Sequence, residues 1–112
     1  MGVLAQGDFV YEVSLLIQWA RKNGYVLTFG EAFRTPEQQA LHIAAGRSTT
    51  KNSRHLVRMA IDFNVFKDGK LLSTKAQLKP VGDYWESLGD HLVWGGSFKS
   101  FFDGGHFQSN AE

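Results

Sequence analysis

The stretch Met59-Ala60-Ile61-Asp62-Phe63-Asn64-Val65 alternates between large apolar residues and small or polar ones. Because successive side chains of a β-strand point to opposite faces, this period of two predicts a strand with one buried face. The four large apolar residues would face the core, and Ala60, Asp62 and Asn64 would face the other way. Asp62 would then carry its carboxylate on the less apolar face, with space beside it left by Ala60.

Further short strands are predicted on both sides of this stretch. Residues 25–29 are β-branched and aromatic, and Asp68-Gly69 is a turn signal that would return the chain into a strand at residues 71–72. Residues 92–94 and 106–108 are predicted as two more strands, joined by a segment rich in glycine and aromatic residues.

The N-terminal part of the chain is predicted to be helical. One apolar stripe with helical spacing is formed by Phe9, Val13, Leu16, Ile17 and Ala20. Arg21 and Lys22 favour the C-terminal end of this helix, and Gly24 is a stop signal.

Two more helices are predicted. Thr35-Pro36-Glu37-Gln38 has the residues of a capped start, for a helix that runs to residue 45. A third helix is predicted at residues 80–88. With helices mostly early and a small antiparallel sheet assembled later, the pattern predicts an α+β fold.

Length and composition limit the protein to a few classes. The 112 residues predict a single domain, residues 1–112, and 43% hydrophobic residues are enough for a folded core. The net charge of +1 argues against a nucleic-acid surface, and no apolar run approaches the roughly 18 residues of a membrane span. The N-terminus lacks the pattern of a signal peptide, so we expect synthesis in the cytoplasm without an export signal.

The chain has no cysteine, so a metal site must use histidine and carboxylate ligands. His55 and Asp62 would lie about 23 Å apart on a straight strand and about 10 Å apart on a straight helix. Both can reach one ion only if the chain bends between them. The alternative from spacing alone is a surface histidine and a half-exposed aspartate.

A second candidate pair is Asp103 and His106, in the segment Asp103-Gly104-Gly105-His106. His106 would be a third metal ligand and Asp103 a general base, with the two glycines permitting close approach of the backbone. The alternative is an ordinary turn in which the aspartate serves only its own backbone.

Arg34 precedes the capped helix and would be placed to hold a substrate carboxylate or a developing oxyanion. Spacing alone favours instead an ion pair with Glu31 or Glu37.

These residues resemble the motifs of a known family. Ser53-x-His55 followed by Ala60-x-Asp62 resembles the Ser-x-His-x-x-Gly-x-Ala-x-Asp signature of the M15 zinc peptidases. The segments Trp94-Gly95-Gly96, Phe98-Lys99-Ser100-Phe101 and Asp103-x-x-His106-Phe107 are similar to the C-terminal signature of the phage endolysin branch. Residues 30–39 resemble the Arg-Thr-x-x-Gln-Gln segment of that branch, so the resemblance covers roughly residues 30 to 108 in order.

The resemblance implies the fold of hedgehog-like and D-Ala-D-Ala-peptidase-like zinc enzymes. It implies Zn²⁺ as cofactor, with His55, Asp62 and His106 as ligands. Asp103 would be the catalytic base, Arg34 would stabilise the transition state, and Ser53 would support the ligands. Two positions depart from the family pattern: Arg58 replaces the usual glycine, and Gln108 replaces the more common glutamate. We expect Gln108 to adjust the surroundings of the metal without abolishing its binding.

The function implied is a single-domain endolysin that cleaves the stem peptide of peptidoglycan between L-Ala and D-Glu. We expect a monomer with no nucleic-acid partner and no stable membrane association, which acts on the cell wall after another protein has permeabilised the membrane. One alternative is a D-Ala-D-Ala carboxypeptidase or dipeptidase. Another is a non-catalytic, zinc-stabilised module that binds the cell wall, and a nuclease is the most distant alternative.

Overall fold

The computed structural model describes residues 3–30, 59–99 and 101–111. Within these ranges the elements are α1 (Val3–Lys22), β1 (Tyr25–Phe29), β2 (Ala60–Lys67), β3 (Lys70–Leu71), α3 (Lys75–Ser87), β4 (Leu92–Trp94), the short 3-10 helix η2 (Gly95–Ser97) and β5 (His106–Ser109). The helix predicted from Thr35 to residue 45 lies outside the described residues.

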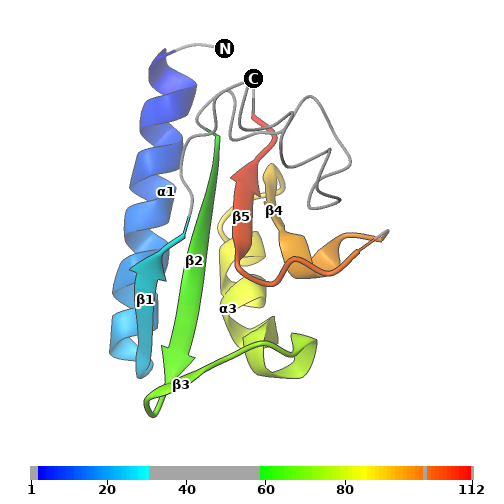
Figure 1. The fold of residues 1–112 in the computed structure, drawn as a ribbon. Coiled ribbons are helices and arrows are strands. Elements are labelled where there is room, and N and C mark those ends of the chain that lie inside the picture. Colours follow the sequence, from blue (N-terminus) through cyan, green and yellow to red (C-terminus); the bar gives the residue numbers. More distant parts are fainter. Residues whose placement is uncertain (1–2, 31–58, 100, 112) are drawn as a thin grey trace.

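The strands form one antiparallel sheet in the order β1-β2-β5-β4, with β3 also paired to β2 (Figure 1). The longest strand, β2, pairs with β1 over residues 63–67 and with β5 over residues 60–62. The predicted α+β fold with a small antiparallel sheet is therefore confirmed. The sheet also includes β1, which comes early in the chain.

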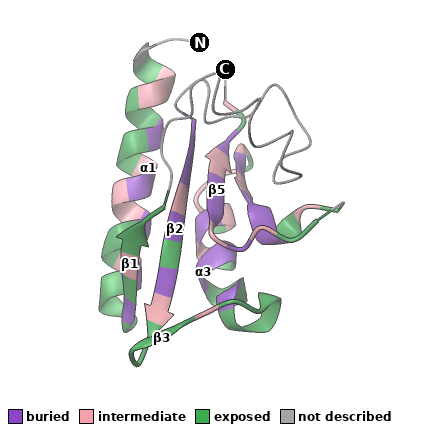
Figure 2. Cartoon of the chain, in the orientation of Figure 1, coloured by how far each residue is buried: buried purple, intermediate pink, exposed green. Residues whose placement is uncertain are grey.

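Burial along β2 follows the predicted period of two (Figure 2). Met59, Ile61, Phe63 and Val65 are buried, whereas Asp62 is half-buried and Asn64 is exposed. Ala60 lies on the same face as Asp62 and is buried too. The face that carries Asp62 is therefore partly covered at one end and open toward the middle of the strand.

Both helices pack against the apolar face of the sheet (Figure 1). The core contains Phe9, Val13, Leu16 and Ala20 from α1 and Leu78, Val81 and Trp85 from α3, together with residues of the strands. Four of the five residues predicted for the apolar stripe of α1 are thus buried. Ile17 is exposed, so it does not share the buried face of the other four. Among the described residues, neither helix combines the length and the apolar character that crossing a membrane requires.

Two predicted chain reversals occur where the sequence indicates them. Gly24 follows α1 with a φ of 85°, a left-handed conformation that favours glycine and ends the helix. Asp68 and Gly69 both have positive φ, at 53° and 76°, as a tight hairpin turn between β2 and β3 requires. Local residue chemistry was therefore sufficient to predict both reversals.

The start of α3 differs from the prediction, because the helix begins at Lys75 rather than at Pro80. Thr74 is the N-cap: its side chain accepts a hydrogen bond from the Gln77 backbone, and the Gln77 side chain accepts one from the Thr74 backbone. This capping box satisfies amide groups that the helix leaves without partners. It starts the helix early enough to place Pro80 in its interior.

Replacing Gly82 with alanine is expected to destabilise the protein by about 1–3 kcal/mol, although alanine favours helices by about 1 kcal/mol. A Cβ at this position would lie 2.0 Å from an atom of the buried Trp94 ring, so the ring or the helix would have to shift. Urea denaturation measures the effect. The same substitution at Gly7, where nothing lies within 4 Å of the added Cβ, should be neutral or stabilising. A Gly82 variant as stable as wild type would contradict this packing argument.

Candidate metal centre

The pairing of β2 with β5 brings Asp62 and His106 together. The two residues are direct partners in the antiparallel ladder, so their side chains leave the sheet on the same face. The distance from His106 Nδ1 to Asp62 Oδ1 is 3.1 Å. His106 itself is buried. A sheet register thus joins two groups that are 44 residues apart in the sequence.

Asp103 reaches the same place from the loop before β5. Its backbone N–H donates to the Gly95 carbonyl oxygen, and its own carbonyl oxygen accepts from the His106 N–H. Gly105 lies against β2, where a Cβ would be 2.5 Å from the Phe63 carbonyl oxygen. Glycine at this position lets the loop pass close to β2, and the Asp103 carboxylate lies 3.8 Å from His106 Nδ1.

Asp62, Asp103 and His106 form a set of donors suited to a divalent metal ion. One ligand atom from each lies within 4.8 Å of the others. Two atoms that each bind one zinc ion at about 2.0–2.2 Å are at most about 4.4 Å apart. His106 Nδ1 meets this condition with both carboxylates. One nitrogen and two carboxylate donors also match the ligand chemistry of zinc.

The electrostatics of the cluster favour a cation. Burial is the largest single influence on the pKa of the His106 imidazole and lowers it, but the hydrogen bond and negative charge of Asp62 act in the opposite direction. Gln108 and Asp103 add to the increase, and the pKa lies above its ordinary value of 6.5. The two carboxylates stabilise a proton on the His106 ring. They would also stabilise a metal ion bound to that ring in place of the proton.

In the metal-free protein, the free energy of unfolding is expected to fall as the pH rises above about 6.5. The folded state binds the His106 proton more tightly than the unfolded chain does, because the pKa is raised on folding. This contribution is fully present below the unfolded pKa and is lost as the pH rises through the folded one. Urea denaturation with a chelator present measures it, and Asp62→Asn should flatten the dependence. A free energy that stays constant over this range would contradict the prediction.

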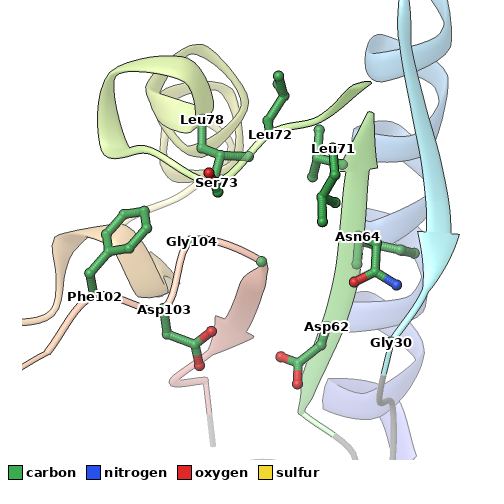
Figure 3. A pocket seen from close by; sticks show the side chains of 13 residues that line it. Gly30, Asp62, Asn64, Leu71, Leu72, Ser73, Leu78, Phe102, Asp103 and Gly104 are labelled. Atoms are coloured by element: carbon green, nitrogen blue, oxygen red, sulfur yellow. The ribbon is translucent and has the colours of Figure 1, made fainter. Parts of the chain in front are cut away.

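A pocket of about 600 Å³ adjoins the two carboxylates. Asp62 on β2 and Asp103 on the loop point toward each other across it, as Figure 3 shows. Leu71, Leu78 and Phe102 contribute apolar side chains to its wall. Acidic groups and an apolar wall therefore lie side by side, in a pocket large enough for a few residues of a peptide.

The structure brings together three of the residues that the sequence analysis singled out: Asp62, Asp103 and His106. His55, Arg34, Ser53 and Arg58 lie outside the described residues, and their predicted roles stay predictions.

The sequence analysis missed several residues that line the pocket. Leu78 escaped notice because α3 was expected to start two residues after it. Gly30 lies at the pocket because β1 pairs with β2, which no local pattern indicates. Asn64 had a usable signal, since the period of two places it on the same face as Asp62.

Comparisons with known proteins agree with this arrangement. A family model described as D-alanyl-D-alanine carboxypeptidase, of the M15 peptidases, matches residues 46–109. An L-alanyl-D-glutamate peptidase of Listeria phage A118 is 37% identical over an alignment of 99 residues, and the match covers 85% of this chain. The match covers 34% of the phage protein, so the chain spans about a third of its length.

Two solved structures share the fold. The Serratia marcescens L-Ala D-Glu endopeptidase ChiX superposes with a TM-score of 0.76 and 24% identity, over 92% of this chain and 78% of that one. A mutant of the vancomycin resistance D,D-pentapeptidase VanY, in complex with Zn(II), superposes with a TM-score of 0.59 and 15% identity, over 93% and 71% of the two chains. With a family model that matches most of the chain and a fold shared with these peptidases, the chain belongs to the M15 peptidase family.

Proposed function

We propose that this protein is a zinc-dependent peptidase that cleaves the stem peptide of peptidoglycan between L-Ala and D-Glu. The observation that carries the proposal is the convergence of Asp62, Asp103 and His106 beside a pocket. The 37% identity to a phage L-alanyl-D-glutamate peptidase supports the choice of bond.

Asp62 and His106 would hold the metal, with His55 as the third ligand. Zinc bound there would act as a Lewis acid on the scissile carbonyl and make water more acidic. The side chains of the two described ligands are held by neighbouring strands of the sheet, whose pairing fixes where they meet. A site built on paired strands keeps its geometry better than one built on loops.

Asp103 would act as the general base, taking a proton from the attacking water and passing it to the leaving amine. Its carboxylate is farther from His106 Nδ1 than that of Asp62, 3.8 Å against 3.1 Å, and its side chain is 44% exposed. It points into the pocket where substrate and water would meet. Arg34 would stabilise the oxyanion that develops on the carbonyl oxygen.

The pocket suits a short peptide. Its volume of about 600 Å³ lies within the range of about 300–1,000 Å³ that is typical of ligand pockets. The apolar wall of Leu71, Leu78 and Phe102 would contact methyl groups of alanine residues. In this proposal the protein acts as a monomer, without nucleic acid or stable membrane association, on the cell wall after a separate protein has opened the membrane.

The test is digestion of purified peptidoglycan, followed by mass spectrometry of the products. Cleavage at the proposed bond releases peptides that begin with D-Glu and leaves L-Ala on the glycan. Asp103→Asn serves as the control for a contaminating hydrolase. Zinc-loaded wild-type protein that releases no product from any stem peptide would contradict the proposal and favour the wall-binding module instead.

A second candidate is a D-Ala-D-Ala carboxypeptidase, which the description of the matching family model favours. This activity would shorten the stem peptide by its terminal D-Ala and leave the L-Ala–D-Glu bond intact. The same mass spectra distinguish the two activities, because they act at opposite ends of the stem.

A further inference from the structure

His106 has a second polar contact, on the side of its ring away from the carboxylates. His106 and Gln108 are two residues apart on β5, so their side chains lie on the same face of the sheet. The His106 Nε2 and the Gln108 Oε1 are 2.7 Å apart. Each nitrogen of the buried imidazole therefore has an acceptor oxygen within hydrogen-bond distance, Asp62 Oδ1 at Nδ1 and Gln108 Oε1 at Nε2.

The orientation of the Gln108 amide is set by the next residue on the same face. Gln108 Nε2 donates a hydrogen bond to Asn110 Oδ1 at 2.7 Å, which turns the Gln108 carbonyl oxygen toward His106. The backbone N–H of Asn110 donates in turn to the His91 carbonyl oxygen. The side chains of His106 and Gln108 on β5 and of Asn110, just after the strand, form one line of hydrogen bonds. The strand itself is paired on both sides, by β2 and β4.

This line of hydrogen bonds favours a hydrogen on Nε2 of His106. A carbonyl oxygen only accepts, so a hydrogen bond to Gln108 Oε1 requires a hydrogen on His106 Nε2. A neutral imidazole has a single N–H, for which the Asp62 carboxylate at Nδ1 and the Gln108 oxygen at Nε2 compete in the metal-free protein. With a metal ion on Nδ1, that hydrogen would lie on Nε2 and be donated to Gln108. A histidine ligand binds a metal through the nitrogen that carries no hydrogen.

We propose that Gln108 is a positioning residue that holds His106 in the tautomer and ring orientation in which Nδ1 faces the metal. The inference rests on the zinc site of the proposed function and adds a residue to it. Without the Gln108 oxygen, His106 would gain freedom to place its hydrogen on Nδ1 and donate it to Asp62. That arrangement directs a hydrogen at the position where the metal would bind.

The test compares two substitutions of similar size. Gln108→Glu keeps an oxygen that accepts from Nε2, whereas Gln108→Met removes the acceptor and keeps the length. We expect Gln108→Met to weaken zinc binding by about 10–100-fold, as loss of a partner of a ligand does. We expect Gln108→Glu to bind zinc at least as tightly as wild type. Gln18→Met, at an exposed position of α1, is the matched control and should leave zinc binding unchanged.

A second measurement needs no metal. Nitrogen-15 NMR of the metal-free protein, at an alkaline pH where His106 is neutral, reports which ring nitrogen carries hydrogen. Because the Asp62 carboxylate competes for the hydrogen at Nδ1, the quantity compared is the share of His106 that carries hydrogen on Nε2. That share should be similar or larger in Gln108→Glu than in wild type, and clearly smaller in Gln108→Met. A merely structural role of Gln108 would lower the melting temperature without changing the tautomer.

The outcomes separate this inference from the proposed function. If wild type binds zinc and Gln108→Met keeps both the wild-type affinity and the wild-type share of hydrogen on Nε2, the inference about Gln108 is wrong and the zinc site stands. If wild type itself binds no zinc, the proposed function fails and the inference fails with it.

Discussion

Asp103→Asn is expected to keep zinc and lose hydrolysis by about 10²–10⁴-fold, the usual contribution of a general base. The amide has the shape of the carboxylate but cannot take a proton from water. The backbone contacts that place residue 103, with Gly95 and His106, do not involve the side chain and should survive the substitution. Loss of rate should therefore come from chemistry and not from displacement of the loop.

Metal content after gel filtration and the rate of peptidoglycan digestion measure the two parts of this prediction. The exposed Asp83, which forms an ion pair with Lys79 on the surface of α3, offers a matched control. Asp83→Asn should change neither quantity. Loss of zinc in Asp103→Asn would identify Asp103 as a ligand, a role that its distance from His106 Nδ1 also permits.

Asp62→Asn is expected to differ from Asp103→Asn, because it should lose zinc. Its loss of activity should be a consequence of the lost metal. An amide oxygen is a weaker ligand than a carboxylate, because it brings no negative charge to the cation. The loss of zinc affinity should exceed the about 10–100-fold typical of a residue that only supports a ligand. Activity should return in part when zinc is added in excess.

Titration of each variant with zinc, followed by calorimetry and by hydrolysis, measures the difference between the two aspartates. In metal-free Asp62→Asn the pKa of His106 should also fall, because burial then opposes the charged imidazole with less compensation. An Asp62→Asn variant that holds zinc as tightly as wild type would remove Asp62 from the set of ligands.

Much of the fold was predictable because the signals are local. Alternation along β2, the aromatic and β-branched segment of β1 and the Asp68-Gly69 turn each follow from the geometry of a few adjacent residues. The start of α3 shows how such signals compete. Proline favours the first turn of a helix, but the capping box of Thr74 and Gln77 lies upstream and sets the boundary.

The chemical types of the candidate site are also set by the sequence. A chain without cysteine must bind metal with histidine and carboxylate groups, and the spacing of Asp103 and His106 around two glycines predicts a turn that can approach another strand. The resemblance to M15 peptidases selected these residues from the other acidic residues and histidines. The predicted roles of His55, Arg34 and Ser53 stay predictions, because these residues lie outside the described part of the structure.

For the described residues, the sequence alone determined which segments become strands and turns and where α1 lies, and which side chains offer metal-binding chemistry, because these depend on neighbouring residues. Only the tertiary structure decided that Asp62 lies opposite His106, since the register of two strands from distant segments depends on how the whole core packs. It likewise decided that the Gln108 oxygen faces His106 Nε2. Hydrogen-bond direction between side chains is fixed by atomic positions, which no residue pattern specifies.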